Sequence, residues 1–261
     1  MILVVKYGGA VLGGSAGGAD PVLADCAALV REGHRLALVH GGGPAIDAAL
    51  REKGIVEKRI AGLRVTSRAS LDVVESVLCA TVNKSLVRAL CAQGVAAVGI
   101  SGEDGPTLVA RAAAPRDGQS LGFVGEIVAV RPELVAALLE AQFLPVVAPL
   151  GVASDGSTAY NINGDTAAGA LAGALRADAF VAITDVPKIR RDVNDPESAV
   201  DRLERAELVR WHEERLLGGG MLPKVESALA ALSSGAKRAI VAGTGPDAIR
   251  RALDGAGTEI A

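Results

Sequence analysis

The sequence predicts an α/β protein, a three-layer αβα sandwich with a mainly parallel central sheet. Short apolar runs rich in β-branched residues alternate along the chain with longer segments whose apolar residues recur at helical spacing. Buried parallel strands read as continuous apolar runs, and parallel strands are joined by helical crossovers, so we expect helices on both faces of the sheet. A chain of 261 residues can form this architecture as one large or two modest domains.

The first half of the chain begins this sheet. We expect strands at residues 2–5, 36–39, 95–100 and 144–147, and helices at residues 21–32, 44–53, 69–92 and 132–141. Residues 107–111 and 123–130 are short runs separated by polar residues, which is typical of an antiparallel pair. The sequence Ser154-Asp155-Gly156-Ser157 predicts a hairpin turn that leads to Tyr160.

The second half repeats the alternation of strands and helices. We expect a helix that ends near residue 175, further helices at 208–216, 223–233 and 246–253, and strands at 179–184 and 239–242. We divide the chain into two lobes, residues 1–163 and 164–261, with a soft boundary at 161–165. One sheet is expected to run through both lobes.

Composition and charge exclude several classes of protein. Half of the residues are hydrophobic and 22% are charged, as in soluble globular proteins, and the formal net charge of −3 gives no general attraction for nucleic acid or anionic lipid. The apolar stretches fall short of the roughly 18 residues that span a bilayer. The N-terminus has no basic segment or cleavage site of a secretory signal. We therefore expect a cytoplasmic protein with neither a nucleic-acid nor a membrane partner.

The cysteines do not indicate a disulfide framework. Cys79 and Cys91 lie on one predicted helix, roughly 18 Å apart along its axis, which is too far for a bond between them. We expect them and Cys26 to be free, buried thiols.

Two glycine-rich loops follow neighbouring predicted strands. The first strand ends in Lys6-Tyr7-Gly8-Gly9 and the second in His40-Gly41-Gly42-Gly43-Pro44. Both loops would lie at the carboxyl edge of a parallel sheet, where backbone N–H groups can cradle a phosphoryl group. For either loop alone a tight strand-to-helix turn is the favoured explanation, because glycine-rich turns are common, and neither loop has the spacing of a dinucleotide fingerprint or a P-loop.

Three charged residues stand in unusual surroundings. Lys6 follows an apolar strand, so its ammonium group either meets an anion or carboxylate or reaches solvent along its stem. Lys224 stands at the beginning of a predicted helix, where the dipole disfavours a cation and an anionic ligand would offset this. Asp165 opens another predicted helix, where it either stabilises the N-terminus or organises the two lysines.

Taken together, an ordered set of motifs from about residue 2 to about residue 230 resembles the amino-acid kinase family. The segments that carry the resemblance are Lys6-Tyr7-Gly8-Gly9, His40-Gly41-Gly42-Gly43, Gly62-Leu63-Arg64-Val65-Thr66, Val82-Asn83-Lys84, Ser101-Gly102-Glu103-Asp104-Gly105, Gly122-Phe123-Val124-Gly125, Tyr160-Asn161-Ile162-Asn163-Gly164-Asp165, Thr184-Asp185-Val186-Pro187 and Gly220-Met221-Leu222-Pro223-Lys224. The resemblance implies the amino-acid kinase fold.

It also implies a reaction. The γ-phosphoryl group of ATP, carried with Mg²⁺, would pass to the side-chain carboxylate of N-acetyl-L-glutamate on the route to arginine. By resemblance, Lys6 and Lys224 stabilise the transferred group and Asp165 holds both lysines. No general base is needed, because a carboxylate is already ionised at neutral pH. The sequence offers no dedicated carboxylate cluster for the metal.

The resemblance assigns the amino acid to the first lobe and the nucleotide to the second. The phosphoryl and reacting carboxylate oxygens would accept hydrogen bonds from the backbone N–H groups of Gly8, Gly9, Gly42 and Gly43. Arg64, on a predicted β-hairpin, would form a bidentate pair with the α-carboxylate of the substrate. Asn161 or Asn163 would bind its acetamido group or main-chain carboxylate. The implied nucleotide residues are Thr184, Asp185, Val186, Lys188, Ile189, Gly218 and Gly220.

The sequence departs from the family pattern at two positions. Ser67 stands where Asp is common, and Lys188 stands where Gly is usual, which would alter the nucleotide pocket or add a phosphate contact. The sequence also begins at the first strand, without the N-terminal helix of hexameric, arginine-inhibited relatives. We therefore expect an arginine-insensitive homodimer, with the helix at 69–92 as an interface element or a core-facing helix.

Two alternative functions remain. A kinase for a carrier-bound aminoadipate or glutamate, in lysine or arginine biosynthesis, is favoured by some likeness in residues 237–260. Such relatives usually replace residues 62–66 with a more basic loop, and this sequence retains the motif. A ligand sensor on the same fold would not need Lys6, Asp165 and Lys224 together.

Overall fold

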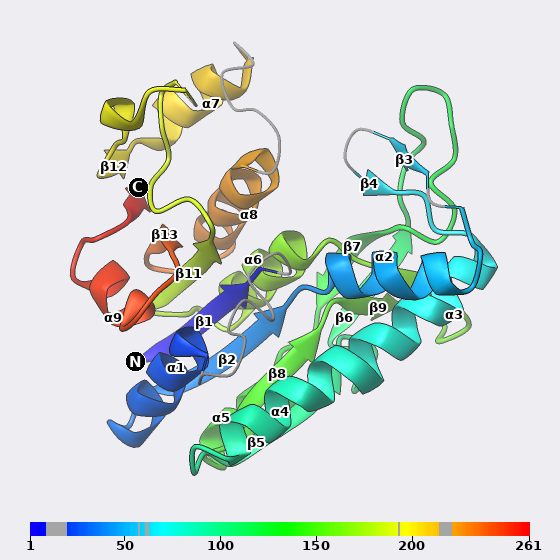
Figure 1. The fold of residues 1–261 in the computed structure, drawn as a ribbon, viewed down its shortest axis with the longest axis horizontal. Coiled ribbons are helices and arrows are strands. Elements are labelled where there is room, and N and C mark those ends of the chain that lie inside the picture. The colour runs from blue at the N-terminus through cyan, green and yellow to red at the C-terminus, as the bar shows by residue number, and fades with distance from the viewer. Residues whose placement is uncertain (9–19, 57, 61–62, 193, 214–220) are drawn as a thin grey trace.

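An eight-stranded sheet forms the centre of the computed structural model, which describes residues 1–8, 20–56, 58–60, 63–192, 194–213 and 221–261. The sheet has the order β12-β14-β13-β11-β1-β2-β8-β5, and helices lie on both of its sides (Figure 1). Its neighbouring strands are parallel except for the pair β13–β14, so the predicted fold class is confirmed. Its strands are β1 (Ile2–Tyr7), β2 (Arg35–His40), β5 (Ala97–Ser101), β8 (Leu144–Ala148), β11 (Ala179–Thr184), β12 (Arg202–Leu203), β13 (Ala239–Gly243) and β14 (Thr258–Ile260).

Alternate strand residues enter two separate cores, one on each face of the sheet. Leu3 and Val5 of β1 join the core beneath α1, α2, α4 and α9, whereas Val4 joins the core beneath α5, α6, α7 and α8. The helices are α1 (Pro21–Arg31), α2 (Gly43–Glu52), α3 (Arg68–Glu75), α4 (Asn83–Cys91), α5 (Glu133–Glu140), α6 (Gly164–Ala174), α7 (Arg205–Glu213), α8 (Met221–Ser233) and α9 (Ala248–Leu253), with a 3₁₀ turn η2 (Pro196–Ser198). Among the residues described, no helix is long and apolar enough to cross a membrane.

Two smaller sheets lie beside the carboxyl ends of the first strands. The predicted antiparallel pair is present as β6 (Leu108–Ala112) and β7 (Gly125–Val130), and the predicted hairpin joins β9 (Leu150–Val152) to β10 (Ala159–Asn161). These four form one sheet in the order β10-β9-β6-β7. The hairpin expected around Arg64 is present as β3 (Arg59–Ile60) and β4 (Leu63–Arg64).

The long helix predicted at residues 69–92 is continuous but irregular. It runs through α3, a π-helical segment η1 (Ser76–Val82) and α4 (Figure 1). The apolar stripe faces the core, since its members are buried, namely Leu71, Val74, Val77, Leu78, Val82, Leu86 and Leu90. The core-facing interpretation is therefore confirmed, and its role in a subunit interface stays a prediction.

The far edge of the sheet and the cysteines differ from what the sequence predicted. The strands β12 and β14 were not expected, because runs of two and three residues carry too little periodicity to be recognised. All three cysteines are free, but only Cys26 is buried, Cys79 is half-buried and Cys91 is exposed. Cys91 is the last residue of α4 and lies on the outer side of that helix. The division into two lobes stays a prediction.

Helices α6 and α8 approach each other through glycine. A Cβ atom at position 169 would lie 2.3 Å from the backbone oxygen of Ser227, and one at position 173 would lie 2.3 Å from Cβ of Ser234. Because α6 carries Asp165 and α8 carries Lys224, this close contact also sets the separation of those two side chains.

We expect Gly169→Ala to destabilise the protein by about 1 to 3 kcal/mol, because the added methyl group pushes α8 away from α6. Thermal denaturation checks this. Thr166→Ala, on the exposed side of the same helix, is the control and should leave the melting temperature nearly unchanged. Equal melting temperatures for Gly169→Ala and the wild type would show that the close approach of the two helices does not depend on glycine.

Candidate active site

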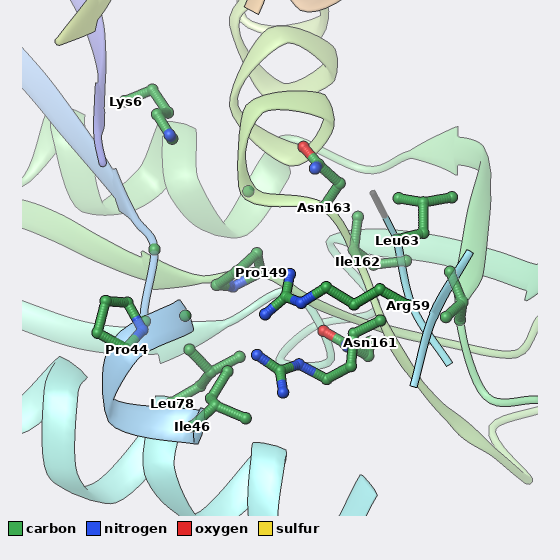
Figure 2. A pocket seen from close by; sticks show the side chains of 16 residues that line it. Lys6, Pro44, Ile46, Arg59, Leu63, Leu78, Pro149, Asn161, Ile162 and Asn163 are labelled. Carbon is green, nitrogen blue, oxygen red and sulfur yellow. The ribbon is translucent and has the colours of Figure 1, made fainter. Parts of the chain in front are cut away.

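A cavity of about 260 Å³ lies at the carboxyl edge of β1 and β2. The glycine loop after β2, the hairpin β3–β4 and the beginning of α6 contribute to its lining. In Figure 2, Lys6 lies on one side of it, with Arg59, Asn161 and Asn163 on the other. The cavity is therefore where the parallel-sheet rule places a ligand.

Lys6, Asp165 and Lys224 meet beside this cavity. The ammonium nitrogen of Lys6 lies 2.9 Å from Oδ1 of Asp165, and that of Lys224 lies 3.7 Å from Oδ2. Strand β1 carries Lys6, the first turn of α6 carries Asp165, and α8 carries Lys224. The structure therefore brings together the three residues to which the sequence assigned catalysis, and their roles stay predictions.

Burial shapes the chemistry of Lys6. Its side chain is 6% exposed, and desolvation lowers the pKa of its ammonium group. Asp165 opposes this shift, Lys224 adds to it, and Asp185 opposes it more weakly. An anion that arrives beside Lys6 would favour its charged form, so the group is suited to binding a phosphoryl oxygen.

The glycine loop after β2 leads directly into helix α2. Gly42 is the N-cap residue of α2, and no side chain accepts from the first N–H groups of this helix. Because Gly41, Gly42 and Gly43 line the cavity, the N-terminus of α2 lies at the cavity wall. A Cβ atom at Gly42 would lie 2.6 Å from Cδ2 of Leu78, so the loop needs glycine there. Gly8 is buried at the end of β1, and Gly9 lies outside the described residues.

Arg64 is buried on β4 and contacts Asp47 of α2, which also pairs with Arg59 at 3.3 Å. Both arginines line the cavity. Neither Arg59 nor Asp47 was expected from the sequence to have a role. Arg59 and Arg64 are directly opposite each other across the hairpin. Two like charges in this position repel each other, so the pair is unfavourable unless an anion offsets the repulsion. Arg59 could have been predicted from the hairpin expected around Arg64, because a hairpin places a residue of the first strand opposite Arg64.

Asn161 and Asn163 both line the cavity but make different contacts. The amide of Asn161 donates to Oγ1 of Thr66 at 3.1 Å, and Thr66 in turn donates to the backbone oxygen of Arg64. Asn163 is the N-cap of α6, because its Oδ1 accepts from the backbone N–H of Asp165 at 2.8 Å and of Thr166 at 3.1 Å. Asn161 is thus linked to the Arg64 strand, and Asn163 positions Asp165.

Most of the predicted nucleotide residues lie at the end of β11 and directly after it. The hydroxyl of Thr184 donates to the carboxylate of Asp185 at 2.8 Å. Asp185 is close enough to Lys6 to raise the pKa of that lysine. Val186 is half-buried. Lys188 pairs with Asp201 rather than pointing to the lysine cluster. Ile189 is fully buried in the core, and its backbone N–H donates to Thr258, so its side chain is not open to a ligand. Gly218 and Gly220 lie outside the described residues. These assignments stay predictions.

The described part of the chain holds no group of three His, Cys, Asp or Glu side chains that could bind a metal ion. Magnesium commonly binds through one or two carboxylates together with substrate phosphates, so an exposed carboxylate such as that of Asp185 fits an ion that arrives with a nucleotide.

Comparisons with known proteins agree with this geometry. Residues 1–243 match the model of the amino acid kinase family. An acetylglutamate kinase of Methanopyrus kandleri is 44% identical over 78% of this chain and 84% of its own length. One from Brevibacillus brevis is 41% identical over 94% of this chain and 91% of its own length. The N-acetylglutamate synthase of Neisseria gonorrhoeae, solved with coenzyme A and N-acetyl-glutamate, superimposes with a TM-score of 0.81 and 27% identity over 100% of this chain and 59% of that one. With its sheet, its paired lysines and these similarities in agreement, the chain belongs to the amino acid kinase family.

Proposed function

We propose that this chain transfers the γ-phosphoryl group of ATP to the side-chain carboxylate of N-acetyl-L-glutamate, giving N-acetyl-L-glutamyl 5-phosphate and ADP in arginine biosynthesis. The observation that carries the proposal is the meeting of Lys6 and Lys224 at Asp165, beside a cavity that contains Arg64. The relatives named acetylglutamate kinase, which match most of the chain, support the choice of substrate.

The two lysines supply charge where it spreads in the transition state. In phosphoryl transfer, negative charge lies on the three equatorial oxygens, and the protein contributes mainly positioning and electrostatic stabilisation. Lys6 from β1 and Lys224 from α8 approach Asp165 from separate elements, so they can contact the transferred group from two sides. Asp165 holds the lysines, while the carboxylate substrate attacks without a general base.

The cavity provides two recognition points for the amino acid. The N–H groups of Gly42 and Gly43, which line the cavity, receive the reacting oxygens, and Arg64 of the hairpin pairs with the α-carboxylate. Asp47 contacts Arg64 from α2 and keeps its guanidinium at the cavity wall. Asn161, linked to Arg64 through Thr66, lies where it can bind the acetamido group.

The second lobe, residues 164–261, binds ATP in this proposal, and Mg²⁺ enters with its phosphates. Strand β11 lies on the side of β1 away from the hairpin β3–β4 (Figure 1), and Thr184 and Asp185 stand at its end, which supports a nucleotide there. Lys188 would need to leave Asp201 to reach a phosphate.

We also propose that the protein is a cytoplasmic homodimer. Strand β5 is an edge of the eight-stranded sheet, and its residues 97–100 are half-buried beside the polar outer side of α4. A second copy could cover this edge together with the outer side of the long helix.

The reaction is tested by ADP release from MgATP in the presence of hydroxylamine, which traps an acyl phosphate. N-acetyl-L-glutamate, free glutamate, N-acetyl-aminoadipate and no acceptor are compared. We expect turnover with N-acetyl-L-glutamate and little with the others. If none of these acceptors reacts, a carrier-bound aminoadipate or glutamate becomes the substrate to test, and a ligand sensor the remaining alternative.

Replacing Lys224 with alanine should lower kcat about 100-fold or more, because one source of transition-state charge is lost. Substrate binding should change much less, so the KM values stay within a few fold. Lys6→Ala should behave similarly. Steady-state kinetics with both substrates checks this, and unchanged turnover for Lys224→Ala would contradict its role.

Replacing Arg64 with alanine should act mainly on the amino-acid substrate. Loss of a charged hydrogen-bonding group predicts a KM for N-acetyl-L-glutamate raised about tenfold to 100-fold, with the KM for ATP nearly unchanged. The matched control is Arg111→Ala, which removes an exposed arginine paired with Glu126 outside the cavity lining. Equal effects of the two substitutions would count against recognition by Arg64.

A further inference from the structure

Two fully buried polar side chains, His40 and Asn83, support the glycine loop and have no part in the reaction described above. His40 is the last residue of β2 and is 0% exposed, and Asn83 begins α4 and is 1% exposed. Buried polar groups are normally kept for the hydrogen bonds they make. Their contacts therefore show what they do.

The hydrogen bonds define the state of the His40 ring. Its Nδ1 lies 2.8 Å from the backbone oxygen of Gly41, and a carbonyl can only accept, so Nδ1 carries the hydrogen. Its Nε2 lies 3.2 Å from the amide nitrogen of Asn83 and accepts from it. Burial lowers the pKa of His40 to about 4, which keeps the ring neutral and this direction of donation in place at neutral pH.

Asn83 is itself held by the sheet. Its two amide N–H groups are shared among three acceptors, namely Nε2 of His40, the backbone oxygen of Val146 in β8 at 2.8 Å and that of Ile100 in β5 at 3.2 Å. A Cβ atom at Gly99 would lie 1.9 Å from Oδ1 of Asn83, so glycine at that position makes room for the amide. The network therefore connects three strands of the central sheet to the loop.

The π-helical segment explains how one helix contacts the loop twice. The backbone N–H of Asn83 donates to the backbone oxygen of Leu78, five residues earlier, which brings positions 78 and 83 onto one side of the helix. Leu78 packs where a side chain on Gly42 would lie, and Asn83 reaches the same loop through His40. In a regular α-helix these two positions would face different directions.

The carbonyl of Gly41, which accepts from His40, is in the same peptide group as the N–H of Gly42. The carbonyl of Gly41 and the N–H of Gly42 belong to one planar, trans peptide group and point in opposite directions. Glycine on both sides gives this group little intrinsic resistance to rotation. The bond from His40 fixes the carbonyl, and with it the direction of the Gly42 N–H.

We propose that His40 and Asn83 are positioning residues for phosphoryl transfer, which hold the Gly41–Gly42 peptide in the orientation that directs the Gly42 N–H at the reacting oxygens. The inference rests on the proposed kinase function. It predicts a loss in kcat rather than in substrate affinity, because the N–H is most effective where charge develops.

The test compares two substitutions that keep different parts of the imidazole. The amide of His40→Asn can place a donor near the Nδ1 position, whereas that of His40→Gln reaches the Nε2 position. We expect His40→Asn, which keeps the donor to Gly41 but not the contact with Asn83, and Asn83→Ala to lose kcat by no more than about threefold, and His40→Gln, which loses the donor to Gly41, to lose about tenfold or more, with the KM for ATP little changed. Similar losses for both His40 variants would overturn the proposal. Leu86→Val, a mild core substitution one turn along α4 from Asn83, is the control and should alter stability without altering kcat.

A second readout does not depend on activity. Nitrogen NMR of the His40 ring should show a neutral ring protonated at Nδ1 in the wild type, and this preference should weaken in Asn83→Ala. A ring protonated at Nε2, or a charged one, would overturn the inference. If the wild type shows the Nδ1 tautomer but phosphorylates none of the acceptors, the proposed function fails while the network stands. If the wild type is active and His40→Gln is unaffected, the positioning role fails while the proposed function stands.

Discussion

The ion cluster at Asp165 is the interaction on which the site depends. A buried lysine is unfavourable without a partner, and Asp165 supplies one to Lys6 at the end of β1 while also reaching Lys224 on α8. Three separate elements are thereby fixed relative to one another at the same edge of the sheet. The Asn163 cap fixes the first turn of α6, so the carboxylate has a defined position before any ligand enters.

Close backbone approaches make that arrangement possible. Gly169 lets α8 come near enough to α6 for Lys224 to reach Asp165, and Gly42 lets the loop after β2 lie against Leu78. Gly99 makes room for the Asn83 amide that supports the same loop. In each case the missing Cβ permits a contact between elements that a larger residue would hold apart. Packing of the helices and geometry of the site are therefore set by the same positions.

Local pattern was sufficient for most of the fold but only for part of the site. The apolar runs predicted the central parallel strands, because burial on both faces leaves a continuous signal. Strands as short as β12 leave none. Lys6, Asp165 and Lys224 were found because their surroundings are unusual and their motifs resemble a family. Arg59 was missed, since its meaning appears only when the hairpin places it opposite Arg64, and the bond between His40 and Asn83 joins residues 43 apart in sequence.

Two clusters of cations, each around one aspartate, lie at different ends of the cavity. At one end Lys6 and Lys224 share Asp165, and at the other Arg59 and Arg64 share Asp47. An anion that enters either cluster gains contact with cations that the protein has already brought together, without the cost of assembling them. A substrate with a carboxylate at each end can therefore be oriented by the arginines while its other carboxylate meets the lysines and the glycine loop. The rigid support of that loop by His40 and Asn83 then matters more than added affinity, because phosphoryl transfer is accelerated by groups held in place before the charge develops.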